Sequence, residues 1–290
     1  MPELPEVEVI KIFLEDKLLN QKIVSLDILN AKSFIGDPKD IINKKIIRFT
    51  RIGKQLSIHL NNGKIMLVHL KMTGQLLYLP PLSRGGPEGG GVFLGHPTKS
   101  FNQKSTRLKF NFSDSSILFF NDQRKFGWIK IYNNQSELSE DQKNLGHDIF
   151  DDKFTPDYLY SQLQRSKAPI KSILLDQHFF AGIGNIYAND ALFLSKIHPS
   201  TPSNKIQRTS VLALHNNLLL IMRQSVLAGG STMKDNKYIR PDGSFGNNQF
   251  FFRVYQRAGE PCLVCKTKIK RIVVGGRGTF FCPKCQKSSL

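Results

Sequence analysis

The chain of 290 residues is long enough for roughly two domains, with hydrophobic cores that need no disulfides. Its 40% hydrophobic and 22% charged residues are typical of a globular protein and exclude general disorder. A net charge of +18 favours polyanionic partners, nucleic acid before an anionic membrane surface. The longest apolar runs are too short to cross a bilayer, and the acidic N-terminus lacks the features of a signal peptide. We therefore expect a soluble, cytoplasmic protein.

The first 133 residues predict one helix followed by short strands. Apolar residues at 7, 10, 14 and 18 recur at helical spacing, and the later runs alternate apolar and polar side chains with period two. Asn61-Asn62-Gly63 is typical of a hairpin turn, because Asn and Gly tolerate positive φ. The Gly-rich residues 84–96 are expected to form a loop. The expected strands are residues 24–28, 45–51, 55–60, 64–70, 75–79, 107–112, 117–121 and 128–132.

The second half of the chain predicts helices. An acidic stretch, 134–153, suits a linker, and Thr155-Pro156 begins a helix, with Thr as the cap and Pro in the first turn. Residues 205–227 indicate a long buried helix that ends at Gly229-Gly230, and 231–249 are expected to form a loop. Strands first and helices second predict an α+β protein with separate cores. The division that we expect is 1–133, 134–153, 154–250 and 251–290.

All four cysteines lie near the C-terminus, as Cys262-x2-Cys265 and Cys282-x2-Cys285. Because disulfides are uncommon in the cytosol, these two pairs predict one tetrahedral Zn²⁺ site, structural because four thiolates leave no open position. The alternative is four unrelated buried thiols. The metal would fix a β-hairpin whose tip presents Arg277 among glycines, where Arg could bind a phosphate; a solvated turn is the alternative.

The N-terminus offers a second kind of chemistry. Removal of Met1 would expose Pro2, whose secondary amine can attack an aldehyde carbon and form an iminium that acidifies the neighbouring C–H. Glu3 and Glu6 stand close by for proton transfer. The structural alternative is that these acids only cap the following helix against its dipole.

Several distinctive segments follow one another along the chain, namely 1–8, Gly53-Lys54, 69–74, 122–127, 182–188 and the cysteine-rich tail. In these segments and in their order, the whole chain resembles bacterial formamidopyrimidine-DNA glycosylases. The resemblance implies an N-terminal catalytic β-sandwich domain, a linker, a helical domain with a helix-two-turns-helix element and a C-terminal zinc finger, over the four ranges given above. It also implies removal of oxidised purines (8-oxoguanine and formamidopyrimidines) from double-stranded DNA by a monomer, with strand cleavage by β,δ-elimination.

The resemblance also implies catalytic roles. Pro2 is implied to be the nucleophile at C1′, Glu3 the group that donates and accepts protons, and Glu6 a supporting carboxylate. Lys54 matches the loop lysine that meets the phosphate beside the lesion; otherwise it would be a surface lysine.

Further positions match residues that contact DNA in this family. Met72, Arg124 and Phe126 match the side chains that fill the gap left when the damaged base is turned out of the duplex. Without the resemblance, Met72 and Phe126 would be core residues and Arg124 a solvated one. Asn185, after a Gly-x-Gly that lacks the third glycine of a dinucleotide site, matches the residue that clamps the DNA backbone together with Arg277. The 231–249 loop corresponds to the family's lesion-base lid.

Two other functions remain open at this point. Endonuclease VIII, a sister enzyme, uses the same nucleophile on oxidised pyrimidines; Leu4 and the complete set of gap-filling residues favour the purine enzyme. A lesion-binding protein without enzymatic activity is the other alternative. Retention of Met1 would favour it, because Met1 blocks the amine of Pro2.

Overall fold

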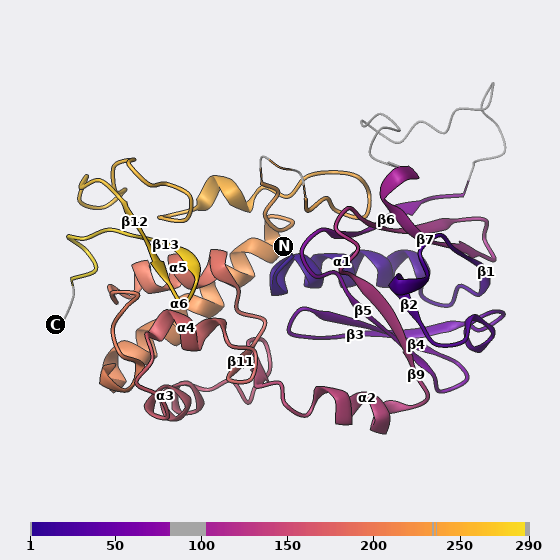
Figure 1. Cartoon of the computed structure of the whole chain (residues 1–290), viewed down its shortest axis with the longest axis horizontal. Coiled ribbons are helices and arrows are strands. Elements are labelled where there is room, and N and C mark those ends of the chain that lie inside the picture. The colour runs from indigo at the N-terminus through magenta and orange to yellow at the C-terminus, as the bar shows by residue number, and fades with distance from the viewer. Residues whose placement is uncertain (1, 82–102, 234, 236, 288–290) are drawn as a thin grey trace. The chain divides into compact units, whose positions relative to one another are not determined.

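The computed structural model describes residues 2–81, 103–233, 235 and 237–287 (Figure 1). The expected loop at 84–96 lies outside these residues. The chain forms two compact units, Met1–Lys143 with Ala228–Asn247, and Asn144–Leu227 with Asn248–Leu290. Residues 228–247, which the sequence analysis places with the helical domain, thus group with the N-terminal unit. Within the described ranges, no helix has both the length and the apolar character needed to span a bilayer.

The first unit begins with helix α1 (Leu4–Leu18), whose apolar residues at 7, 10, 14 and 18 are all buried, as predicted. The hairpin turn is also found, with Gly63 at φ +83° between two strands. All eight expected strands are present to within one residue at each end. The strands of this unit are β1 (Ile23–Ile28), β2 (Phe34–Ile35), β3 (Ile46–Ile52), β4 (Gln55–Leu60), β5 (Ile65–His69), β6 (Gly74–Leu79), β7 (Thr106–Phe112), β8 (Ile117–Asp122) and β9 (Trp128–Tyr132).

These strands form the two sheets of a β-sandwich (Figure 1). One sheet has the order β1-β7-β8-β6 and the other β2-β9-β5-β4-β3, with only the short β2–β9 pair parallel. Helix α1 packs against β3 and β4, and a single core joins apolar side chains of the helix and of both sheets. Connections β5–β6 and β8–β9 both cross from one sheet to the other, which matters for the site below.

The second unit is mainly helical. Helix α3 (Pro156–Gln164) begins as predicted, with the Thr155 hydroxyl accepting the Tyr158 N–H. The predicted helix at 205–227 is shorter, because 203–205 form a separate 3-10 turn, and one face is exposed, with Leu227 90% accessible. The remaining elements of this unit are α4 (Ile170–Leu175), α5 (Asn185–Leu194), α6 (Arg208–Leu227), β10 (His147–Asp148), β11 (Phe180–Ala181), β12 (Lys270–Val274) and β13 (Arg277–Phe281).

The expected linker at 134–153 is more ordered than its acidic composition indicates. It contains α2 (Gln135–Gln142) and β10, which pairs with β11. Asn134 explains the helix, since its side chain accepts the Glu137 N–H and caps the first turn. The α+β fold class is confirmed, with a β-sandwich, a helical unit and a C-terminal hairpin.

Candidate active site

The N-terminal residues are buried at the start of α1. Pro2 is buried, Glu3 is 3% exposed and Glu6 is 1% exposed. Glu3 and Glu6 form a reciprocal capping box, in which the Glu3 N–H donates to Glu6 Oε2 at 2.9 Å. The capping role that the sequence allowed is therefore real, and it holds both carboxylates beside Pro2.

Glu6 also joins this segment to a distant part of the chain. Its Oε1 accepts the N–H of Ser231 at 2.9 Å, across 225 residues. The approach requires Gly230, at φ +81°, because a Cβ there would lie 3.1 Å from Glu6 Cγ and 2.8 Å from the Tyr238 ring. The start of the 231–249 loop therefore lies against the Glu6 carboxylate, which also accepts the Glu3 N–H.

Lys54 lies half-buried in the turn between β3 and β4, after Gly53 at φ +56°. Arg51 holds this turn, because its Nη1 donates to the Gly53 carbonyl at 2.9 Å and its Nε donates to Glu8 Oε2 at 2.6 Å. Burial would raise the pKa of Glu8, but the hydrogen bonds and charges of Arg51 and Lys11 outweigh it and lower this pKa overall. Helix α1 thus anchors the turn that carries Lys54 by a charge-assisted contact.

His69, at the end of β5, lies in a positively charged environment. Burial, and then the charges of Lys71 and Lys54, lower the pKa of His69 to about 3. The ring is therefore neutral at physiological pH, and its Nδ1 accepts the Lys71 N–H at 3.1 Å. The charges of Lys54 and Lys71 thus both act on this imidazole, an arrangement that suits an anionic group.

The three expected gap-filling residues lie on two neighbouring connections. Met72, half-buried, is on the β5–β6 connection, and Arg124 and Phe126 are on the β8–β9 connection. Phe126 is 53% exposed, and the Arg124 guanidinium carbon lies 4.9 Å from its ring centroid. Phe126 is therefore not a core residue, which was the alternative to a role in DNA binding.

In the second unit, Asn185 is the first residue of α5. Its Nδ2 donates to the carbonyl of Gly278 at 3.2 Å, directly after Arg277 in the hairpin β12–β13. The hairpin turn consists of Gly275 and Gly276, at φ +55° and +71°, which leaves the exposed Arg277 at the start of β13. The structure thus places Asn185 against the residue that follows Arg277, so these two predicted DNA-binding residues lie on neighbouring segments.

The four cysteines have the arrangement of a tetrahedral metal site. Their Sγ atoms all lie within 4.8 Å of one another, with 3.9 Å between Cys262 and Cys285 and 3.4 Å between Cys265 and Cys282. Zinc–thiolate bonds of about 2.3 Å require sulfur pairs about 3.8 Å apart, so the donor set fits Zn²⁺. The predicted structural zinc site is confirmed. Four sulfur ligands leave no position for substrate, and the metal's role is to stabilise the hairpin.

Comparisons with known proteins agree with this geometry. Residues 1–129 match the formamidopyrimidine-DNA glycosylase N-terminal domain, 145–237 match its H2TH domain, and 259–287 match the zinc finger found in FPG and IleRS. The formamidopyrimidine-DNA glycosylase of Ligilactobacillus salivarius is 37% identical over 99% of both chains. This chain belongs to the formamidopyrimidine-DNA glycosylase family. The resemblance noted in the sequence is confirmed.

Solved structures of this glycosylase family share the whole fold. The crystal structure of the MutM (Fpg) protein of Thermus thermophilus has a TM-score of 0.84 and 30% identity, with 100% of each chain covered. A complex of Lactococcus lactis Fpg with abasic-site DNA has a TM-score of 0.85 and 29% identity, covering 99% of this chain and 100% of that one.

The sequence gives no sign of a buried lysine that supports the zinc hairpin of this glycosylase. Lys171, in α4, is 0% exposed and donates to the Gly278 carbonyl at 2.9 Å and to Thr279 Oγ1 at 2.7 Å. Asn189 of α5 adds to this, since its Oδ1 accepts the Phe280 N–H at 2.8 Å. A lysine in an apolar hexapeptide has no local pattern that predicts such a role.

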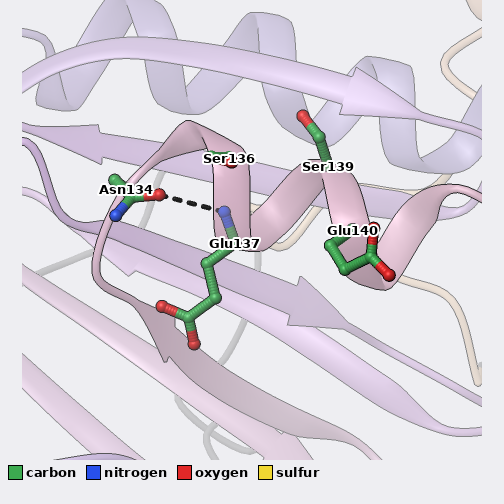
Figure 2. A pocket seen from close by; sticks show the side chains of 5 residues that line it. All are labelled: Asn134, Ser136, Glu137, Ser139 and Glu140. Atoms are coloured by element: carbon green, nitrogen blue, oxygen red, sulfur yellow. Dashed lines mark hydrogen bonds between the residues drawn. The ribbon is translucent and has the colours of Figure 1, made fainter.

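Figure 2 shows a pocket on α2 that contains none of the expected site residues. It is lined by Asn134, Ser136, Glu137, Ser139 and Glu140. Its carboxylates would repel DNA phosphates, so we assign it no part in the glycosylase site.

Proposed function

We propose that this protein removes oxidised purines, 8-oxoguanine and formamidopyrimidines, from double-stranded DNA and then cleaves the strand as an AP lyase. Family membership makes it a DNA glycosylase of base excision repair; the lesion class and the lyase step are the parts that we add. The observation that carries the proposal is the buried Pro2–Glu3–Glu6 group at the start of α1. Once Met1 is removed, the nitrogen of Pro2 is a secondary amine beside two buried carboxylates, which suits covalent catalysis better than a capping role at the surface.

The mechanism requires that Met1 be removed. The nitrogen of Pro2 then attacks C1′ of the damaged nucleotide, and the bond from C1′ to the base breaks. Glu3 donates a proton as the sugar ring opens, which leaves an iminium between Pro2 and C1′. Loss of the acidified C2′ proton to a carboxylate expels the 3′ phosphate (β-elimination), and a second elimination expels the 5′ phosphate.

The remaining site residues bind the DNA in this proposal. Lys54 contacts the phosphate beside the lesion, while Asn185 and Arg277 hold the backbone around the extruded nucleotide. Met72, Arg124 and Phe126 occupy the gap, and the 231–249 loop covers the lesion base. We also propose that the protein acts as a monomer with a catalytic sandwich domain, a linker, a helical domain and a zinc finger, although residues 228–247 group with the N-terminal unit.

Reductive trapping tests the proposal. Borohydride reduces an iminium to a stable amine, so it should link the Met1-free protein covalently to a duplex that contains 8-oxoguanine. A duplex with an oxidised pyrimidine, assayed in parallel, tests the endonuclease VIII alternative and should be cleaved less efficiently. Tight binding without any adduct would instead support a lesion-binding protein that has no enzymatic activity.

A further inference from the structure

Two connections between the sheets meet at one end of the β-sandwich. The β5–β6 connection carries Met72, and the β8–β9 connection carries Arg124 and Phe126. They approach closely, because a Cβ on Gly127 would lie 3.2 Å from both the His69 carbonyl oxygen and Asp122 Oδ2. The half-buried Met72 and the exposed Arg124 and Phe126 therefore stand on two loops with little space between them.

Asp122, the last residue of β8, lies beneath both loops and is 0% exposed. Its Oδ2 accepts the N–H groups of Phe126 and Gly127, each at 2.7 Å. Its Oδ1 accepts the Arg124 N–H at 3.1 Å and the hydroxyl of Thr73, the residue after Met72. A single carboxylate thus binds both connections, using both of its oxygens.

Thr73 completes the link between the two loops. Its Oγ1 donates to Asp122 and accepts the Arg124 N–H at 3.1 Å, and its side chain is buried. The carboxylate is itself fixed, since the Asp122 backbone pairs with Gly74 of β6 and its carbonyl accepts Arg107 Nε at 2.8 Å. Movement of one loop relative to the other would break several of these hydrogen bonds.

We propose that Asp122 is a positioning residue that holds Met72, Arg124 and Phe126 as one rigid unit for insertion into the duplex. The inference rests on the proposed function, in which these three side chains occupy the gap left by the extruded base. The arrangement fixes their relative positions before DNA binds, which lowers the entropy cost of inserting three side chains together.

The test replaces the carboxylate with an amide. In Asp122→Asn one acceptor becomes an NH2 group, which faces either the two N–H groups on Oδ2 or the donors on Oδ1. We expect excision of 8-oxoguanine from a duplex, measured in single turnover, to fall about 100-fold, because buried donors lose their acceptor. Borohydride trapping on a single-stranded oligonucleotide with an abasic site needs no gap to be filled, and it should stay within about twofold of wild type.

Asp114→Asn is the matched control. Asp114 also accepts an N–H and a hydroxyl, both from Ser116, but in the turn at the opposite end of β8. It should leave both activities unchanged. Thr73 provides variants independent of Asp122: Thr73→Val should lower duplex excision about tenfold, and Thr73→Ser, which keeps the hydroxyl, should restore it.

The possible outcomes distinguish the positioning role of Asp122 from the proposed function itself. The positioning role would be overturned if Asp122→Asn lost activity equally on duplex and single-stranded DNA. It would also be overturned if neither Asp122→Asn nor Thr73→Val lost activity. In both cases an active wild-type protein would still support the proposed function. A wild-type protein that neither excises the base nor forms the adduct would overturn the proposed function and this inference with it.

Discussion

The two units hold their functional segments by different means. In the N-terminal unit, an extensive apolar core supports loops that buried carboxylates fix through N–H donors, with Glu6 and Asp122 as the main acceptors. In the second unit, the C-terminal hairpin has only a small apolar cluster, which includes Cys262 and Cys282. A segment with so little core needs a metal and strong polar contacts to stay ordered. The comparison indicates that the hairpin, with its small apolar cluster, depends on its metal and polar contacts, whereas the loops of the β-sandwich rest on a large core.

The largest expected effect is a loss of catalysis in the N-terminal unit without a loss of DNA binding. Glu3→Gln keeps an oxygen that can cap α1 but loses the transferable proton, so we expect 8-oxoguanine excision to fall about 1000-fold while duplex affinity changes little. Single-turnover excision and a binding titration measure the two quantities. Glu15→Gln, in the same helix, is the control. A parallel loss of affinity would mean that Glu3 serves the fold rather than the reaction.

The second largest effect is expected when the zinc site of the C-terminal hairpin is removed. Cys262→Ser removes one of the four zinc ligands. We expect duplex affinity to fall by about tenfold or more, because the segment that presents Arg277 loses its order. Zinc content and duplex affinity should decline together. The cooperative unfolding of the β-sandwich should remain. Unchanged duplex binding by metal-free protein would contradict the distinction between the units.

A smaller effect is expected from loss of the polar contacts that support the hairpin. Lys171→Met leaves the Gly278 carbonyl and Thr279 hydroxyl without this donor, and we expect a cost of about 1–3 kcal/mol in unfolding free energy and weaker duplex binding. Thermal denaturation of the zinc-loaded protein measures the first. Lys167→Met, an exposed neighbour, should have no effect. If both variants behave alike, the buried contacts do not support the hairpin.

The smallest effect is a pH dependence in the first unit. The pKa of Glu8 is lowered in the folded state, so its contribution to stability is present above about pH 4.5 and is lost as the pH falls through the folded-state value. Glu8→Gln should therefore destabilise the protein by about 1–2 kcal/mol at pH 7 and by less near pH 3. Denaturant titrations at both pH values, with Asp16→Asn as control, provide the measurement. A destabilisation that is independent of pH would show that the charge of Glu8 is unimportant.

Local patterns predicted much of this architecture because their physical causes are local. Period-two alternation predicted the strands, helical spacing predicted α1, and the two Cys-x-x-Cys pairs predicted the zinc site. The contact from Ser231 to Glu6 could not be predicted in this way, since it joins residues that no sequence periodicity relates. Together with Tyr238, which lies in the core of the N-terminal unit, and the Tyr78 N–H that donates to the Pro241 carbonyl, this contact holds residues 228–247 to that unit.

Support residues were harder to predict than the residues they support. Asp122 stands in the motif at 122–127, but its four donors come from two connections, and only the tertiary fold brings them together. Lys171 is likewise buried, and it donates hydrogen bonds to residues more than a hundred positions away. Charged residues in such places follow from the packing of elements and not from their own sequence neighbours.

The central claim is that Pro2 forms the covalent bond to the deoxyribose. Mass spectrometry of peptides from the borohydride-trapped adduct tests this most directly. We predict that the sugar fragment is found on the nitrogen of Pro2 in protein that lacks Met1. Attachment to the side chain of Lys54 or any other lysine would contradict the mechanism.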